Sequence, residues 1–196
     1  DIDNSYSYLV DQRYTTTLFD HIFKSLENNH DLYKMISRIT INGEKTPYNV
    51  NDRVIYIGIL YGIIGFENGL CKIHNRIFEQ RIYNYIISRF SRENDDILPS
   101  NKSSELVKND KLDLEAVLIK FQQFMKENYS PKDAKFIERE GRLLFLSFLK
   151  PIINGKGFDF KEPNVGDERR MDIVITFNDK KYVVELKIWY GQEYHQ

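Results

Sequence analysis

Three charged side chains near the end of the chain have types and spacing that suit the hydrolysis of phosphate esters. Asp172 lies in one run of alternating residues, and Glu185 and Lys187 lie in the next. If the chain turns at Asn178-Asp179, the two runs pair as an antiparallel hairpin in which Asp172 faces Glu185. Side chains directly opposed across such a hairpin have Cβ atoms about 5 Å apart. The spacing therefore predicts two neighbouring carboxylates with a lysine beside them.

Two opposed carboxylates repel one another unless a cation lies between them. Mg²⁺ binds to one or two protein carboxylates together with waters and phosphate oxygens, so the pair predicts a site for Mg²⁺ or Mn²⁺. Lys187, two residues beyond Glu185 on the same face, can stabilise charge on a phosphate or orient a water. Together these groups suit metal-assisted hydrolysis of a phosphodiester. The alternative is that they form the solvated face of an ordinary hairpin.

The segments that carry these residues alternate between apolar and polar side chains, as strands do. Strands are predicted at 158–162, 169–177 and 181–189. One face of the last two strands is wholly apolar and needs cover. Val174 and Val183 make the other face apolar beyond the carboxylates, which favours the rim of a cleft over an open surface.

Two helices are predicted before these strands. The first has apolar residues from Leu114 to Met125 at helical spacing, and the second runs from about Ala134 to Leu149 and stops near Pro151. Ahead of them, residues 93–110 are polar and contain Pro99, which is typical of a linker. The sequence thus predicts an N-terminal domain at 1–92, a linker at 93–110 and a C-terminal domain at 111–196.

The N-terminal domain is predicted to be mainly helical. The pair Asn68-Gly69 indicates a β-hairpin after the third helix, and the order of three helices and a hairpin is a winged-helix arrangement. The third helix is apolar nearly all round, so we expect it to be buried. Its only cation is Arg53, which favours a packing or linking role over the reading of DNA bases. Helices are predicted at 18–26 after Thr15 or Thr17, at 32–39 after Asp31, at 54–60 after Asn51 or Asp52, and at 75–90.

The composition is that of a folded, water-soluble protein. The chain has 196 residues, of which 41% are hydrophobic, and a net charge of −1. No apolar run approaches the roughly 18 residues that would span a bilayer, so no membrane partner is expected. A single cysteine excludes an internal disulfide and suits a cytoplasmic setting. Because the charges balance, any contact with nucleic acid must rest on a local patch.

The order Asp172, then Glu185-Leu186-Lys187, resembles the Asp…Glu-X-Lys signature of the PD-(D/E)XK nuclease superfamily. More specifically, the segments 136–155, 167–174 and 184–189 resemble the nuclease-like C-terminal domain attached to a family of bacterial AAA-type ATPases. The segment 61–78 resembles the winged-helix end of those ATPases, so the resemblance covers most of the chain. No phosphate-binding GxxxxGK[ST] loop is present, so ATP binding is not expected.

The resemblance implies roles for individual residues. It makes Asp172 and Glu185 metal ligands and Lys187 the catalytic lysine. It also implies an acidic residue on the helix before the sheet, for which Glu138 is favoured and Glu140 is the competitor. Glu162 can join the ligands. Arg170, two residues before Asp172 on the same face, would hold a phosphate or else pair with a neighbouring carboxylate.

The expected fold is α+β, a winged-helix-like helical unit followed by a restriction-endonuclease-like, PD-(D/E)XK α/β core. Relatives in the family continue into a further helix and strand, whereas this chain stops at Gln196, so we expect a truncated core whose open edge a partner or an ATPase domain covers. The expected activity is Mg²⁺-dependent cleavage of DNA. The alternatives are a non-catalytic regulatory or protein-interaction module of an ATPase, and a DNA-binding but inactive remnant.

Overall fold

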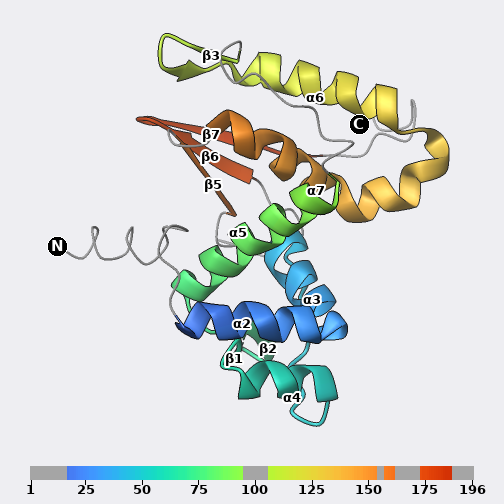
Figure 1. Ribbon diagram of the computed structural model, residues 1–196, viewed down its shortest axis with the longest axis vertical. Helices are drawn as coiled ribbons and strands as arrows, with labels where there is room; N and C mark the ends of the chain where they lie inside the picture. Colours follow the sequence, from blue (N-terminus) through green and yellow to red (C-terminus); the bar gives the residue numbers. More distant parts are fainter. Residues whose placement is uncertain (1–16, 95–105, 154–156, 162–172, 187–196) are drawn as a thin grey trace. The chain divides into compact units, whose positions relative to one another are not determined.

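The computed structural model describes residues 17–94, 106–153, 157–161 and 173–186. Over these ranges the chain is an α+β protein of helices and short antiparallel strands. It divides into two compact units, unit 1 (Asp1–Arg89) and unit 2 (Phe90–Gln196), and most of their elements are labelled in Figure 1. Among the described residues, no helix combines the length and the apolar character needed to cross a bilayer.

The first two helices of unit 1 are separated by Asn29 alone. This residue, rather than the predicted Asp31, precedes the second helix, and Asp31 lies in its first turn, where a carboxylate interacts favourably with the helix dipole. The side chain of Asn29 donates a hydrogen bond of 2.8 Å to the carbonyl oxygen of Ser25 at the end of the first helix. The elements are α2 (Thr17–Asn28), α3 (His30–Ser37) and η1 (Arg38–Asn42), a turn of π-helix.

The third helix, α4 (Arg53–Leu60), begins after one of its two predicted caps. Oδ1 of Asp52 accepts hydrogen bonds from the backbone N–H groups of Val54 (2.8 Å) and Ile55 (3.1 Å). These are donors of the first turn that have no partner within the helix. The N-cap therefore fixes where α4 starts.

The predicted β-hairpin follows α4. Strand β1 (Ile64–Glu67) pairs antiparallel with β2 (Leu70–Ile73). Asn68 and Gly69 between them have φ angles of 50° and 79°, the left-handed values that a two-residue type I′ turn requires. Helix α5 (Arg76–Glu93) then starts within one residue of the predicted position.

The expectation that α4 is buried on all sides is wrong. Only Ile55 and Gly58 are buried, whereas Tyr56 is 51% and Leu60 65% exposed. The helix packs against α3 and β1. After Arg53 this two-turn helix has no charged residue and so no polar stripe to mark its open side, and the sequence pattern could not reveal that side.

Side chains from α2, α3 and α5 form the core of unit 1. The rings of Phe23 and Tyr85 stack with 4.5 Å between their centroids, and the guanidinium of Arg81 lies 4.6 Å from the ring centroid of Phe19. The apolar side chains recur at the three- and four-residue spacing that predicted the helices. The most deeply buried of them are Ile22, Leu26, Leu32, Ile36, Ile82, Ile86 and Ile87.

Two helices precede the sheet of unit 2, as predicted. They are α6 (Leu114–Asn128) and α7 (Ala134–Ile153), joined through the 3-10 turn η3 (Pro131–Asp133). The ring centroid of Phe121 on α6 lies 5.0 Å from that of Phe145 and 5.4 Å from that of Phe148 on α7. Aromatic packing of this kind joins the two helices into one layer.

A short hairpin occupies the end of the segment that was expected to be a linker. Strand β3 (Val107–Lys108) pairs with β4 (Lys111–Leu112), and Asn109 and Asp110 turn between them with φ angles of 51° and 58°. The flanking Leu106 and Leu112 are buried. The end of the expected linker therefore belongs to a hairpin of unit 2 that is anchored by these two leucines. Strands of two residues are too short to give a periodic pattern in the sequence.

The strands β5 (Gly157–Lys161), β6 (Ile173–Phe177) and β7 (Lys180–Val184) form an antiparallel sheet in that order. β6 and β7 turn at Asn178-Asp179 and pair Phe177 with Lys180 and Val174 with Val183. This confirms the predicted register over the described residues. Helix α7 packs against β5 and crosses the sheet in Figure 1.

Candidate functional site

The two faces of the β6–β7 hairpin differ in burial. On one face Ile173, Ile175 and Phe177 are buried, which confirms the predicted apolar face as part of the core. On the other face Val174 in β6 is buried too, whereas its partner Val183 in β7 is 60% exposed, and Glu185, the first residue after β7, is exposed. The face that carries the candidate site is thus open to solvent along β7.

The ladder of paired residues ends one step before the predicted carboxylate pair. Its last described pair is Ile173 with Val184, and the same register carried one residue further would set Asp172 opposite Glu185. Asp172 itself lies outside the described residues. So do Lys187, Arg170 and Glu162, so their juxtaposition stays a prediction.

The two candidate acids on α7 lie in different surroundings. Glu138 is exposed. The side chain of Glu140 is 25% exposed, and its Oε1 accepts a hydrogen bond of 2.7 Å from Nε of Arg139. Residues two apart on a helix point about 200° apart, and Glu140 shares the side of α7 on which the buried Leu144 follows one turn later. Burial favours Glu140 as the acid on the covered side of the helix.

The described ranges hold no group of three or more His, Cys, Asp or Glu side chains placed to bind a metal ion. Glu138, Glu140 and Glu185 therefore do not form such a group by themselves. The predicted ligand pair includes Asp172, which this observation does not cover.

The structure also brings together two hairpin turns that the sequence analysis did not connect. Nδ2 of Asn178, in the β6–β7 turn, donates a hydrogen bond of 2.6 Å to the carbonyl oxygen of Asp110 in the β3–β4 turn. The hydroxyl of Tyr182 donates a second, of 3.3 Å, to the carbonyl oxygen of Leu112. Both turns are Asn-Asp pairs followed by lysine. This repeated Asn-Asp-Lys tripeptide was the sequence feature that could have revealed the similarity of the two turns. It places a lysine at each turn.

Several groups near these elements have pKa values displaced from their ordinary range. The backbone N–H of Ala116 and, next, the ammonium of Lys108 lower the pKa of Asp113, the N-cap of α6. Hydrogen bonds from Ser130 lower the pKa of Asp133 in the same way. In unit 1, burial raises the pKa of the Cys71 thiol, so this thiol stays protonated at neutral pH. These shifts belong to caps and core packing.

Comparisons with protein-family models, with curated proteins and with solved structures found no match to the chain. The functional interpretation therefore rests on the residues and on their geometry.

Proposed function

We propose that the chain is the C-terminal part of an ATPase–nuclease protein and that unit 2 hydrolyses DNA phosphodiester bonds with Mg²⁺ or Mn²⁺. The observation that supports this most is the register of the β6–β7 hairpin. Had the turn formed one residue earlier or later, Asp172 and Glu185 would not be opposed. The register found is the one that a shared cation requires.

The residues present fit such a cation. Carboxylates are the donors that Mg²⁺ prefers, and Glu185 is exposed beside a strand whose outer face is open. In this proposal Asp172 and Glu185 would hold the ion, which would supply Lewis-acid chemistry at the phosphate. Lys187, on the same face, orients the attacking water or stabilises the charge that develops on the phosphate. Arg170 holds a neighbouring phosphate of the substrate.

The proposed fold is a winged-helix-like unit 1 joined to a PD-(D/E)XK-like unit 2. The order of α2, α3, α4 and the β1–β2 hairpin supports the first assignment. Two helices followed by three antiparallel strands, with α7 packed on the sheet, support the second. On this fold an acid from α7 assists the ligand pair. Glu138 and Glu140 are the two candidates, and partial burial favours Glu140.

Metal titration tests the proposal. Calorimetry with MnCl₂ and MgCl₂ and a plasmid-cleavage assay would compare the wild type with Asp172→Ala. The matched control is Asp179→Ala, which removes an exposed aspartate from the turn at the far end of the same hairpin. We expect Asp172→Ala to abolish metal binding and to reduce cleavage by more than the roughly 100-fold that loss of an outer-shell group costs. Asp179→Ala should behave as the wild type.

Further variants separate the roles. Lys187→Met should keep metal binding and lose cleavage, because the lysine is not a ligand. Of Glu138→Gln and Glu140→Gln, the one that weakens metal binding identifies the helix acid. Absence of metal binding by the wild type, or equal binding by Asp172→Ala, would refute the nuclease proposal.

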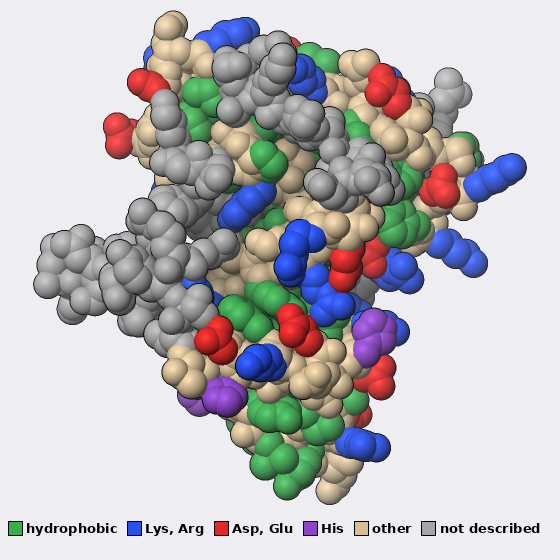
Figure 2. Space-filling view, in the orientation of Figure 1, with side chains coloured by type: hydrophobic (Ala, Val, Ile, Leu, Met, Phe, Trp, Pro, Cys, Tyr) green, Lys and Arg blue, Asp and Glu red, His purple; other side chains and the backbone are tan. Residues whose placement is uncertain are grey.

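One observation favours a second function, that of a protein-interaction module. Large apolar side chains are exposed around α4 and β1, and Figure 2 shows hydrophobic side chains gathered over α4. Arg53 is the only cation of α4, whereas contacts to DNA bases normally need several polar or basic side chains. A Tyr56→Ser, Leu60→Ser double variant that no longer binds an ATPase module, while the wild type does, would support this function. The cluster comprises Val50, Tyr56, Leu60, Tyr61 and Phe66, each about half exposed or more.

A further inference from the structure

The turns of the β3–β4 and β6–β7 hairpins form one composite surface, which we call the lysine edge. It consists of residues 108–111 and 178–181. The hydrogen bond from Asn178 to Asp110 ties the two turns together, and the bond from Tyr182 to Leu112 ties the strands behind them. The two turns are therefore held as one surface, although 68 residues separate Asp110 from Asn178.

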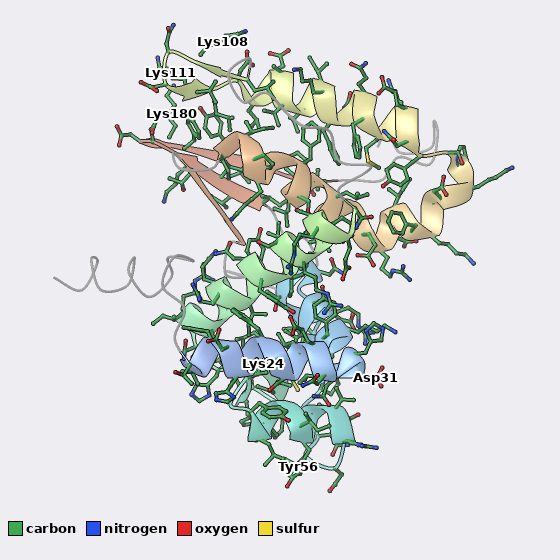
Figure 3. The ribbon with its side chains drawn as sticks, in the orientation of Figure 1. Lys24, Asp31, Tyr56, Lys108, Lys111 and Lys180 are labelled. Atoms are coloured by element: carbon green, nitrogen blue, oxygen red, sulfur yellow. The ribbon has the colours of Figure 1, made fainter. Side chains whose placement is uncertain are left out.

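The lysine edge is positively charged. It contains four lysines and two aspartates, a formal charge of +2, while the whole chain carries −1. Figure 3 shows Lys108, Lys111 and Lys180 extending at one end of unit 2. A lysine places its charge at the end of a four-carbon stem, whereas an aspartate keeps its charge close to the backbone. The outermost charges of this surface are therefore cationic.

Three of these lysines have no acidic partner among the described residues. Lys108 forms an ion pair of 3.1 Å with Asp113, which caps α6. Lys111, Lys180 and Lys181 are all exposed, and within the described part of the chain none of the three forms an ion pair. Their ammonium groups are available to an external anion.

The position of Lys181 relates this surface to the candidate site. Side chains four residues apart on a strand lie on the same face, about 13 Å apart. Lys181 and Glu185 stand in that relation along β7 and beyond its end. The axis of a DNA duplex rises by about 3.4 Å per base pair, so the separation equals the axial rise of about four base pairs.

From this geometry we propose that the lysine edge binds the phosphate backbone of duplex DNA, with Lys111, Lys180 and Lys181 as the contacting residues. The choice of DNA rests on the proposed nuclease function, and the contact with Lys181 places the duplex beside the face of β7 that leads to Glu185. Because it uses only backbone phosphates, the binding is independent of base sequence. It also needs no metal ion.

Binding of a fluorescein-labelled 30-base-pair duplex, measured by anisotropy at several KCl concentrations in EDTA, tests this inference. The test variant is the triple Lys111→Ala, Lys180→Ala, Lys181→Ala. The control is the triple Lys126→Ala, Lys132→Ala, Lys135→Ala, which changes three exposed lysines of the same unit and alters the net charge equally. Circular dichroism would verify that both variants are folded.

We expect the slope of log K against log[KCl] to shrink by about 2 to 3 in the test variant, since each lost phosphate contact removes roughly 0.9. The control variant should keep the wild-type slope. Equal slopes in the two triple variants, or no binding by the wild type at 50 mM KCl (a low ionic strength that favours such contacts), would overturn the proposal.

Glu185→Gln separates this proposal from the nuclease proposal. In EDTA it should bind DNA at least as well as the wild type, because it removes a negative charge and no lysine. If the lysine variant loses DNA binding while the wild type shows no metal-dependent cleavage, the DNA contact stands and the nuclease fails. If cleavage depends on Asp172 while the two triple variants bind DNA alike, the nuclease proposal stands and the proposed DNA contact of the lysine edge fails.

Discussion

The side chain of Asn178 and the backbone of Asp110 join two hairpins that lie far apart in the sequence. Nδ2 of Asn178 donates to the carbonyl oxygen of Asp110 over 2.6 Å, and Asn178 itself has a φ of 49°. Asparagine is among the few residues that adopt this left-handed backbone at little cost. One residue therefore shapes the β6–β7 turn and also fastens it to the β3–β4 turn.

Replacement of Asn178 separates these two roles. Asn178→Ala loses the hydrogen bond and forces an alanine into left-handed backbone, so we expect it to lower the free energy of unfolding by about 2 kcal/mol. Asn178→Gly relieves the backbone and loses only the bond, so it should cost about 1 kcal/mol or less. Urea unfolding followed by circular dichroism measures both. Equal stability of the two variants would contradict this account of the turn.

Gly58 allows α4 to approach its neighbours closely. A β carbon at this position would collide with Cδ1 of Ile64 and would lie 2.7 Å from Cγ1 of Ile64 and 3.1 Å from Cδ1 of Leu32. We expect Gly58→Ala to destabilise unit 1 by about 1 to 3 kcal/mol, because the overlap outweighs the gain of roughly 1 kcal/mol in helix propensity.

Gly141 provides the matched control for this substitution. It also lies in a helix, but its added β carbon would meet only Cγ2 of Ile137, at an ordinary contact distance of 3.6 Å. Gly141→Ala should therefore stabilise unit 2 by about 0.5 to 1 kcal/mol. Thermal unfolding of both variants measures the two changes in stability. A stabilising effect of Gly58→Ala would contradict the close packing of α4 and show that the helix can shift away from Ile64 and Leu32.

Asp52 holds the start of α4 through two hydrogen bonds. Asp52→Ala should lower the free energy of unfolding by about 1 kcal/mol, whereas Asp52→Asn, which retains a side-chain acceptor, should cost much less. Denaturant unfolding compares the two. A loss as large for asparagine as for alanine would mean that the charge of Asp52, rather than its acceptor oxygen, stabilises the helix.

Asp113 makes stability depend on pH in the acid range. Its pKa in the folded chain is below the ordinary value of 3.8 because of the Ala116 N–H and Lys108. A carboxyl group of this kind stabilises the fold above its unfolded pKa, near 4, and the contribution is lost as the pH falls through the lower, folded value. Asp113→Asn, which cannot titrate, removes this dependence.

Thermal unfolding from pH 7 to pH 2.5 measures the effect. The difference in Tm between the wild type and Asp113→Asn should stay constant from pH 7 to about pH 5 and shrink below about pH 4. A difference that grows as the pH falls would show that the pKa of Asp113 is raised rather than lowered by folding.

Local signals in the sequence were sufficient for much of the fold. The Asn68-Gly69 pair located the first hairpin, and the Asn178-Asp179 pair fixed the β6–β7 register to the residue. Asp52 was one of two caps proposed for α4, and its side chain makes the bonds of an N-cap. Each of these features depends on the chemistry of one or two adjacent residues, which a single sequence displays directly.

Features that depend on tertiary contacts between distant parts of the sequence could not be predicted in this way. The apolar sequence of α4 does not say which side its neighbours cover, and the exposure of Tyr56 follows only from the position of α3 and β1. The β3–β4 hairpin is held by contacts with residues about 70 positions later. For the same reason, helical spacing alone could not choose between Glu138 and Glu140.

Cys71 offers a practical advantage that follows from its place in β2. It is the only cysteine of the chain and is shielded from solvent, so a thiol-reactive dye will label an engineered surface cysteine first. Any slower labelling of Cys71 itself then reports how often the hairpin of unit 1 opens. The labelling rate of Cys71 is thus a built-in measure of local unfolding in unit 1.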